Sequence, residues 1–183
     1  MKYKISQFLN NYSNEIYQKL KQLDVSQFEN LRNKIALLKN KNKIILVGNG
    51  GSASISSHVA VDFTKITGKR AICFNEANLI TCFANDYGYS NWVAKSLKFF
   101  AMPGDIIILI SSSGKSKNLI RACQFAKKNK LFVATFTGFK KNNPISKLGN
   151  INFWINSNKY NIIEMVHHIW LVSLVDSLVE QRC

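Results

Sequence analysis

Two loops rich in glycine and serine carry the residues of this sequence best suited to chemistry. The first, at 48–52, reads GNGGS and follows the apolar run at 43–47; the second, at 111–116, reads SSSGKS and follows the apolar run at 105–110. Glycine lets the backbone approach a ligand closely, and serine adds a hydroxyl donor. Where such a loop opens a helix, free N–H groups and the helix dipole favour a phosphate. Either loop alone could be a simple turn or cap, but the pair predicts a phosphate site.

The exact spacing of these loops argues against a nucleotide cofactor. GNGGS lacks the GxGxxG pattern of dinucleotide-binding loops, and SSSGKS lacks the lysine-hydroxyl spacing of the Walker motif. A small phosphoester is therefore the expected ligand.

Two pairs of titratable residues are spaced four apart, as one helix face requires. His58 precedes Asp62, and Glu164 precedes His168. If the two faces meet, they bring together acid–base groups, and the same four residues could hold zinc. His167 points about 100° away from its neighbour on a helix, so His168 is favoured because it shares a face with Glu164. The alternatives are a solvated polar face for the first pair and a satisfied buried or interface histidine for the second.

Alternating elements must position these groups. Helices are expected over 4–23, 26–38, 52–66, 77–84 and 91–100, then after 116 to about 128 and over 160–180, and strands over 43–47, 71–74, 105–110, 131–136 and 151–155. Ser26 and Glu29 fit a capping box at the start of the second helix.

The alternation of strands and helices predicts a three-layer α/β/α sandwich. Its parallel five-stranded sheet is of the flavodoxin-like kind, preceded by N-terminal helices. We expect one domain over 1–183, with the N-terminal helices in 1–41 and the α/β core in 42–183.

The chain has a net charge of +15, carried almost entirely by lysine. Only Arg32, Arg70, Arg121 and Arg182 are arginines. Specific nucleic-acid readers rely on arginine, and the lysines here form no long block. Solvated lysines, or attraction of anionic metabolites, are therefore favoured over nucleic-acid binding.

Cysteine usage and hydropathy indicate a cytoplasmic protein. Cys73, Cys82, Cys123 and Cys183 show no metal-type spacing and read as reduced thiols. No apolar run reaches the ~18 residues of a membrane span, and the N-terminus lacks the apolar centre of a signal peptide. No membrane association is expected.

Four motifs together resemble a known family. They are GNGGSASISSH followed by Asp62, ANDYG at 84–88, ISSSGKSKN at 110–118 and EMVHH at 164–168. Their order and spacing resemble the sugar isomerase (SIS) family. Within it they are most similar to the phosphoheptose isomerases, which typically read GNGGSAADAQH with a later E, then GNDYG, ISTSGNSPN and QExxH. The resemblance covers nearly the whole chain.

The resemblance implies an activity and an assembly. It implies an aldose–ketose isomerase that converts sedoheptulose 7-phosphate to D-glycero-D-manno-heptose 7-phosphate through an enediol. The product would serve lipopolysaccharide or capsule precursors. The family also implies a homotetramer with active sites at subunit boundaries, and some relatives bind zinc at the equivalent helices.

The resemblance also assigns roles to residues. Phosphate would bind at Ser111, Ser112, Ser113 and Ser116. The sugar would be contacted by Asn49, Gly50, Gly51, Ser52, Asp86 and Glu164. Asp62, at the place of the family glutamate, would be the catalytic base. The family's QExxH histidine corresponds to His167, and it is the spacing from Glu164 that favours His168 as the partner and gives the metal set His58, Asp62, Glu164 and His168.

Two departures from the family pattern keep an alternative open. Asp62 is one methylene shorter than the family glutamate, and Val172 stands where the family has its second catalytic histidine. His168 could act from one turn earlier. The alternative is a non-catalytic SIS module that binds a phosphosugar, resembling the initiator-associating protein of bacterial replication.

Overall fold

The computed structural model describes residues 4–180, and helices and strands alternate along that range. In chain order the elements are α1 (Ile5–Leu20), α2 (Val25–Ala36), β1 (Ile44–Gly48), α3 (Gly51–Thr67), β2 (Ala71–Cys73), α4 (Ala77–Tyr87), α5 (Trp92–Phe100), β3 (Ile106–Ser111), α6 (Lys117–Lys128), β4 (Phe132–Thr137), β5 (Ile151–Trp154) and α7 (Tyr160–Ser177). The predicted order of elements is confirmed.

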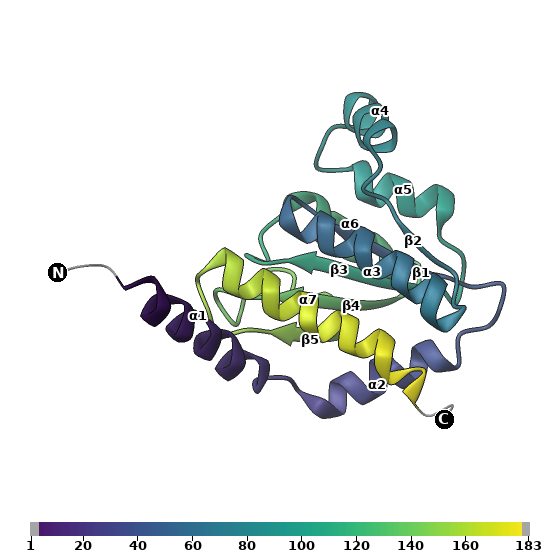
Figure 1. The fold of residues 1–183 in the computed structure, drawn as a ribbon. Coiled ribbons are helices and arrows are strands. Elements are labelled where there is room, and N and C mark those ends of the chain that lie inside the picture. Colours follow the sequence, from purple (N-terminus) through teal and green to yellow (C-terminus); the bar gives the residue numbers. More distant parts are fainter. Residues whose placement is uncertain (1–3, 181–183) are drawn as a thin grey trace.

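The five strands form a parallel sheet in the order β2-β1-β3-β4-β5. Figure 1 shows helices on both sides of this sheet. β1 and β3 lie side by side inside the sheet, and every residue of both strands is buried. The predicted α/β sandwich with a parallel five-stranded sheet is therefore confirmed.

Side chains of the central strands alternate between two hydrophobic cores. Ile106, Ile108 and Ile110 face the core that includes α2, α3 and α7. Ile107 and Leu109 face the core that includes α5 and α6. A strand covered on both faces must be apolar at every position, which explains the continuous apolar run at 105–110.

The start of α2 differs from the predicted capping box. Asp24, not Ser26, is the N-cap residue, and its Oδ1 accepts a hydrogen bond from the Gln27 backbone N–H at 3.0 Å. Both residue types cap helices well. The predicted capping box at 26–29 is therefore wrong, and the N-cap lies two residues earlier in the chain.

Three of the four cysteines lie in the described range, and Cys73, Cys82 and Cys123 are free thiols. Cys183 lies outside the described residues. None of the helices within residues 4–180 combines the length and the apolar character that crossing a membrane would need.

A buried ion pair closes the sheet at the amino ends of β1 and β3. Lys43 Nζ lies 2.7 Å from Asp105 Oδ2. The same carboxylate accepts from the Lys43 and Met102 backbone N–H groups and from Asn42 Nδ2. Burial alone would raise the pKa of Asp105, but these donors, led by Lys43, outweigh it, and the pKa is lowered.

We predict that Asp105 stabilises the fold in full above about pH 4 and progressively less as the pH falls below it. A carboxyl with a lowered folded-state pKa contributes stability that is complete above its unfolded pKa, about 3.9, and is lost as pH falls through the folded value. Asp105→Asn leaves the Lys43 charge unpaired, so we expect a loss of about 3 kcal/mol at pH 7. Urea unfolding at several pH values measures this. The control is Asp176→Asn, at an exposed carboxyl; a loss for Asp105→Asn that did not shrink at acidic pH would contradict the assignment.

Candidate functional site

The loop after β1 is held in place by a side chain from the neighbouring strand's loop. Asn75 accepts from the Gly48 N–H at 3.1 Å and donates to the Gly48 carbonyl at 2.8 Å. Gly50 then adopts a φ of 55°, a conformation that favours glycine, and α3 begins at Gly51. A Cβ on Gly48 would collide with the Ser52 backbone. The sequence therefore needs glycine here to turn a strand directly into a helix.

The serine loop after β3 presents hydroxyls at the start of α6. Ser111 and Ser112 are buried, and Ser111 Oγ donates to Ser116 Oγ at 3.3 Å. Among the described residues, Ser112 Oγ is a buried hydroxyl without a hydrogen-bond partner. Ser113 Oγ accepts from the Lys115 N–H at 3.3 Å. A buried hydroxyl with an unused donor, beside a helix N-terminus, is suited to an anionic oxygen.

A reciprocal pair of amides joins the two loops. Asn49 Nδ2 donates to Asn118 Oδ1 at 3.1 Å, and Asn118 Nδ2 donates to Asn49 Oδ1 at 2.9 Å. The hydroxyl of Tyr89 donates to the same Asn49 Oδ1 at 3.1 Å. Asn118 lies in the predicted ISSSGKSKN motif but was not assigned a role from the sequence, and Tyr89 follows ANDYG. Both residues are far from Asn49 in the sequence, so sequence patterns alone could not predict this contact.

A histidine cluster lies further along α3. His58 Nδ1 and His168 Nε2 are 2.7 Å apart, and His58 Nε2 lies 3.1 Å from Asp62 Oδ2. A carboxylate can only accept, so Nε2 of neutral His58 carries the proton and Nδ1 accepts from His168. Burial lowers the pKa of His168, as does the neighbouring His58, while Asp62 acts in the opposite direction. The two predicted helix faces thus meet through His58 and His168.

Glu164 reaches a different point of the same helix. A Cβ on Gly51 would collide with the Glu164 carboxylate, so this carboxylate lies directly over the start of α3. Burial raises the pKa of Glu164. The Glu164 side chain therefore lies at the first loop, over Gly51 between Gly50 and Ser52, rather than in the histidine cluster.

His167 and His168 have opposite environments. His167 is fully buried, donates from Nε2 to the Thr137 carbonyl at 3.2 Å and packs against Phe136. Burial lowers the pKa of His167 to about 3. It is therefore neutral at physiological pH and belongs to the core between α7 and the sheet, while its neighbour lies beside His58.

Asp86 lies apart from the other predicted site residues. It is exposed on α4, and its contacts within the described residues are with Asn85 and Cys82 on the same helix. α4 itself has no buried residue, and Figure 1 shows it standing away from the sheet above α5.

The arrangement of the cluster does not suit a metal ion as it stands. Histidine and carboxylate are ligand types that zinc accepts. However, His58 uses both ring nitrogens on His168 and Asp62, and Glu164 lies elsewhere. Across residues 4–180, no group of three or more histidine, cysteine, aspartate or glutamate side chains is arranged to hold a metal.

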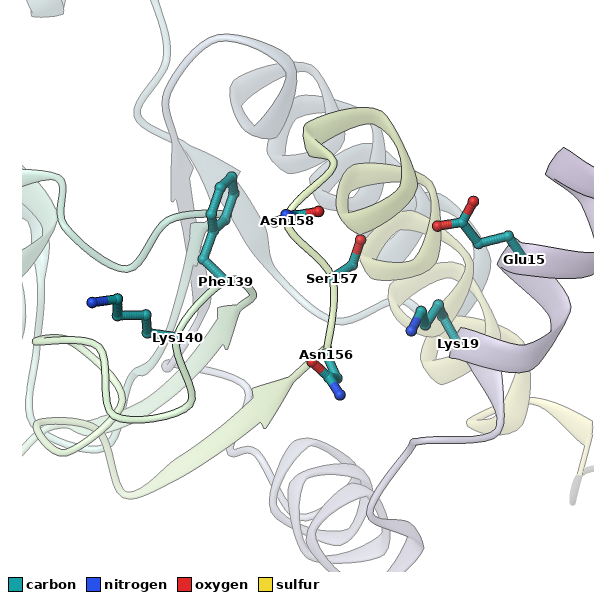
Figure 2. Close-up of a pocket in the computed structure, with 7 residues that line it drawn as sticks. All are labelled: Glu15, Lys19, Phe139, Lys140, Asn156, Ser157 and Asn158. Carbon is teal, nitrogen blue, oxygen red and sulfur yellow. The ribbon is translucent and has the colours of Figure 1, made fainter.

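A further hollow of about 520 Å³ opens at the carboxyl ends of β4 and β5. It is lined by Glu15, Lys19, Phe139, Lys140, Asn156, Ser157 and Asn158. Figure 2 shows the loop 156–158 running between Phe139 and α1. None of these residues was predicted as a site residue, because their elements meet only in the folded chain.

The fold defines a doubly wound α/β protein with its two glycine- and serine-rich loops at the carboxyl edge of the sheet, the edge at which proteins of this class generally bind ligands. The family model described as SIS domain matches residues 10–138. The chain belongs to this family, and the resemblance seen in the sequence is confirmed.

Relatives and solved structures narrow the resemblance. The chain is 42% identical to a phosphoheptose isomerase of Thermodesulfovibrio yellowstonii over 61% of its own length and 58% of that protein, somewhat over half. It is 30% identical to the phosphoheptose isomerase of Buchnera aphidicola, covering 87% of this chain and 86% of the relative. The fold matches the phosphoheptose isomerase GmhA of Neisseria gonorrhoeae with a TM-score of 0.86, 22% identity and coverage of 96% and 98%. It also matches the Vibrio vulnificus NanR protein complexed with ManNAc-6P, with a TM-score of 0.74, 21% identity and coverage of 96% and 64%.

We predict that His167 and His168 both titrate below the ordinary histidine pKa, and that His167 does so much further. His167 should stay neutral down to about pH 3 because it is fully buried, and His168 should titrate below the ordinary value of about 6.5. Unfolded His167 takes up a proton that the buried ring in the folded protein does not bind. The free energy of unfolding therefore falls progressively as the pH drops below about 6.5. Ring ¹⁵N–¹H NMR across pH 4–8 measures each histidine, with His58→Gln, His167→Gln and His168→Gln used to assign the signals. A His167 signal that moves between pH 5 and 7 would show that the core position is wrong.

Proposed function

We propose that this protein is a phosphoheptose isomerase that interconverts sedoheptulose 7-phosphate and D-glycero-D-manno-heptose 7-phosphate. The observation that carries the proposal is that two phosphate-type loops lie side by side, and that an acid–base cluster lies further along α3, the helix that the first loop opens. Ser111, Ser112, Ser113 and Ser116 surround the start of α6, and the loop after β1 is hydrogen-bonded to that start through Asn49 and Asn118. On α3, His58 lies about two turns and the catalytic candidate Asp62 about three turns from the start of the helix.

The spacing of these parts matches a long open-chain sugar. From Gly51 the α3 axis rises about 10 Å to His58 and about 16 Å to Asp62, at 1.5 Å per residue. A phosphate held by the serine loop and a carbonyl at the histidine cluster would therefore belong to opposite ends of one molecule. This supports a substrate with its phosphate on the terminal carbon farthest from the reacting carbons.

The reaction needs two proton transfers, and the cluster offers a group for each. In the ketose, C2 is the carbonyl and C1 carries a hydroxyl. The Asp62 carboxylate takes a proton from C1 and returns it to C2, while His168 takes the O1 hydroxyl proton and gives a proton to O2. The proton that His168 takes from O1 is the one it gives to O2, so the intermediate is an enediolate, and the product has its carbonyl at C1. The lowered pKa of His168 keeps the ring neutral at pH 7, so it can accept and return a proton.

His58 is hydrogen-bonded to both Asp62 and His168 and so fixes the position of one relative to the other. Its Nε2 donates to Asp62 and its Nδ1 accepts from His168 Nε2, which leaves Nδ1 of His168 free to meet the substrate. Zinc binding at this cluster is a separate proposal, and it would require the metal to replace the hydrogen bond between the two rings. No step of the mechanism requires it.

The same cluster supports an assembly of several copies. His58 is 53% exposed, although an enediol must be shielded from water. Apolar side chains surround this face, with Val61 61% exposed on α3 and Ile169 41% exposed on α7. A second copy covering this face would close the site, and we propose the homotetramer that the family resemblance implies.

We place the reaction in the cytoplasm, where the free thiols of Cys73, Cys82 and Cys123 would stay reduced. Its product would enter the synthesis of lipopolysaccharide or capsule precursors. Within this proposal Asp86 and Glu164 contact sugar hydroxyls, Asp86 once α4 is packed against a partner.

We predict that the serine loop binds the phosphate. Ser113→Ala with Ser116→Ala should weaken the binding of sedoheptulose 7-phosphate by about 1–3 kcal/mol, the usual contribution of hydrogen bonds to a charged group. Isothermal titration calorimetry measures the affinity. Ser6→Ala with Ser13→Ala removes two hydroxyls from α1 as a control, and an unchanged affinity in the loop variant would refute the placement.

We predict that Asp62 and His168 carry the chemistry. Loss of a positioned acid or base costs about 10²–10⁴-fold in turnover. Asp62→Asn and His168→Ala should each lose activity on that scale and keep phosphosugar affinity, followed by NMR of the aldose with and without added zinc. His167→Ala should lower stability more than turnover. A wild type that binds the ketose phosphate but never converts it would instead support the non-catalytic SIS module, for which the shorter Asp62 is the motive.

We predict that the face around Val61 and Ile169 joins the copies. Val61→Asp with Ile169→Asp should dissociate the oligomer and lower turnover while the circular dichroism spectrum stays unchanged. Light scattering at micromolar concentration measures the mass. Leu37→Asp is the control, because Leu37 is 82% exposed at the end of a different helix, α2. A wild type that is monomeric in this measurement would exclude the tetramer.

A further inference from the structure

The side-chain amide of Asn49 has almost no hydrogen-bonding capacity left for a ligand. Its Oδ1 has two lone pairs, and these accept from Asn118 Nδ2 at 2.9 Å and from the Tyr89 hydroxyl at 3.1 Å. One of its two Nδ2 protons is donated to Asn118 Oδ1 at 3.1 Å. A single N–H therefore remains, and it can only donate.

The loop that supplies Tyr89 is held from a second side. Arg121 on α6 donates to Ser90 Oγ at 2.7 Å and to Asn91 Oδ1 at 2.5 Å. The segment 89–91 thus connects the start of α5 to the loop after β1 and to α6. The ring of Tyr89 is more than half exposed, so its hydroxyl bond to Asn49, rather than burial, is its main tie to the fold.

We propose that Tyr89 is a positioning residue for substrate binding, acting through Asn49. Together with Asn118 it fixes the Asn49 amide so that the free N–H points away from both partners, toward an oxygen of the bound sugar phosphate. Without the Tyr89 hydroxyl, Oδ1 regains a free lone pair and the amide loses one of its three restraints. This inference rests on the proposed function, in that the ligand is taken to be a phosphorylated sugar.

The proposal predicts an effect on binding and not on chemistry. The base Asp62 lies about 16 Å from the start of α3 along the helix axis, so a change at Asn49 should act on ground state and transition state alike. Tyr89→Phe removes only the hydroxyl. We expect KM and the calorimetric Kd for sedoheptulose 7-phosphate to rise about 3- to 10-fold, as for one lost hydrogen bond, with kcat within about 2-fold of wild type.

A double-mutant cycle shows whether the effect passes through Asn49. Tyr89→Phe should change nothing further in an Asn49→Ala background, because the amide that it positions is gone. Tyr87→Phe is the matched control, since it removes a hydroxyl two residues away for which no hydrogen bond is found within the described residues. Unchanged melting temperatures would show that the loop still folds.

The outcomes separate this inference from the proposed function. If wild type isomerises the ketose phosphate and Tyr89→Phe keeps its Kd, or if kcat falls while Kd is unchanged, the positioning role is wrong. Additive losses in the cycle would also overturn it. If wild type binds sedoheptulose 7-phosphate without converting it and Tyr89→Phe weakens that binding, the positioning role stands and the isomerase activity fails. No binding by wild type would overturn both.

Discussion

The parallel pairing of β1 with β3 is the constraint on which the site depends. It places Gly48 beside Ile110, so the two strands end together and their loops emerge at the same edge. α3 and α6 then start within reach of one another, and the amides of Asn49 and Asn118 can pair. Because both strands are buried over their whole length, a slip in register would cost both cores at once. The geometry of the ligand loops is therefore set by apolar packing below them.

The sequence alone predicted the features that depend on local pattern. Apolar runs gave the strands, and glycines and serines at their ends gave the loops. The i, i+4 spacing favoured His168 over His167, and the structure brings His168, not its neighbour, to His58. Local pattern could not separate Asp24 from Ser26 as a cap, since both types serve.

Contacts between distant residues could not be predicted in the same way. The four proposed metal ligands do not form one group, because Glu164 is a full turn from His168 and meets α3 at Gly51 instead. Spacing shows which side chains share a face but not what lies opposite each turn. Tyr89 and Asn118 were missed for the same reason, as was the hollow bordered by Phe139 and α1. Asp86 matched a motif, yet it lies exposed on a helix that has no fully buried residue.

The attachment of α1 has a consequence for synthesis of the chain. α1 precedes every other described element in the chain, but the contacts of α1 and of the turn after it are made with C-terminal elements. Trp170 Nε1 donates to the Leu20 carbonyl, the Asn156 N–H donates to Gln22, and Lys159 pairs with Glu15. Domains generally fold as units, so α1 docks only when α7 is available. Ile16 and Leu20, which pack against the core in the folded chain, would therefore stay uncovered until α7 is made, and a nascent chain truncated before α7 should expose them to chaperones.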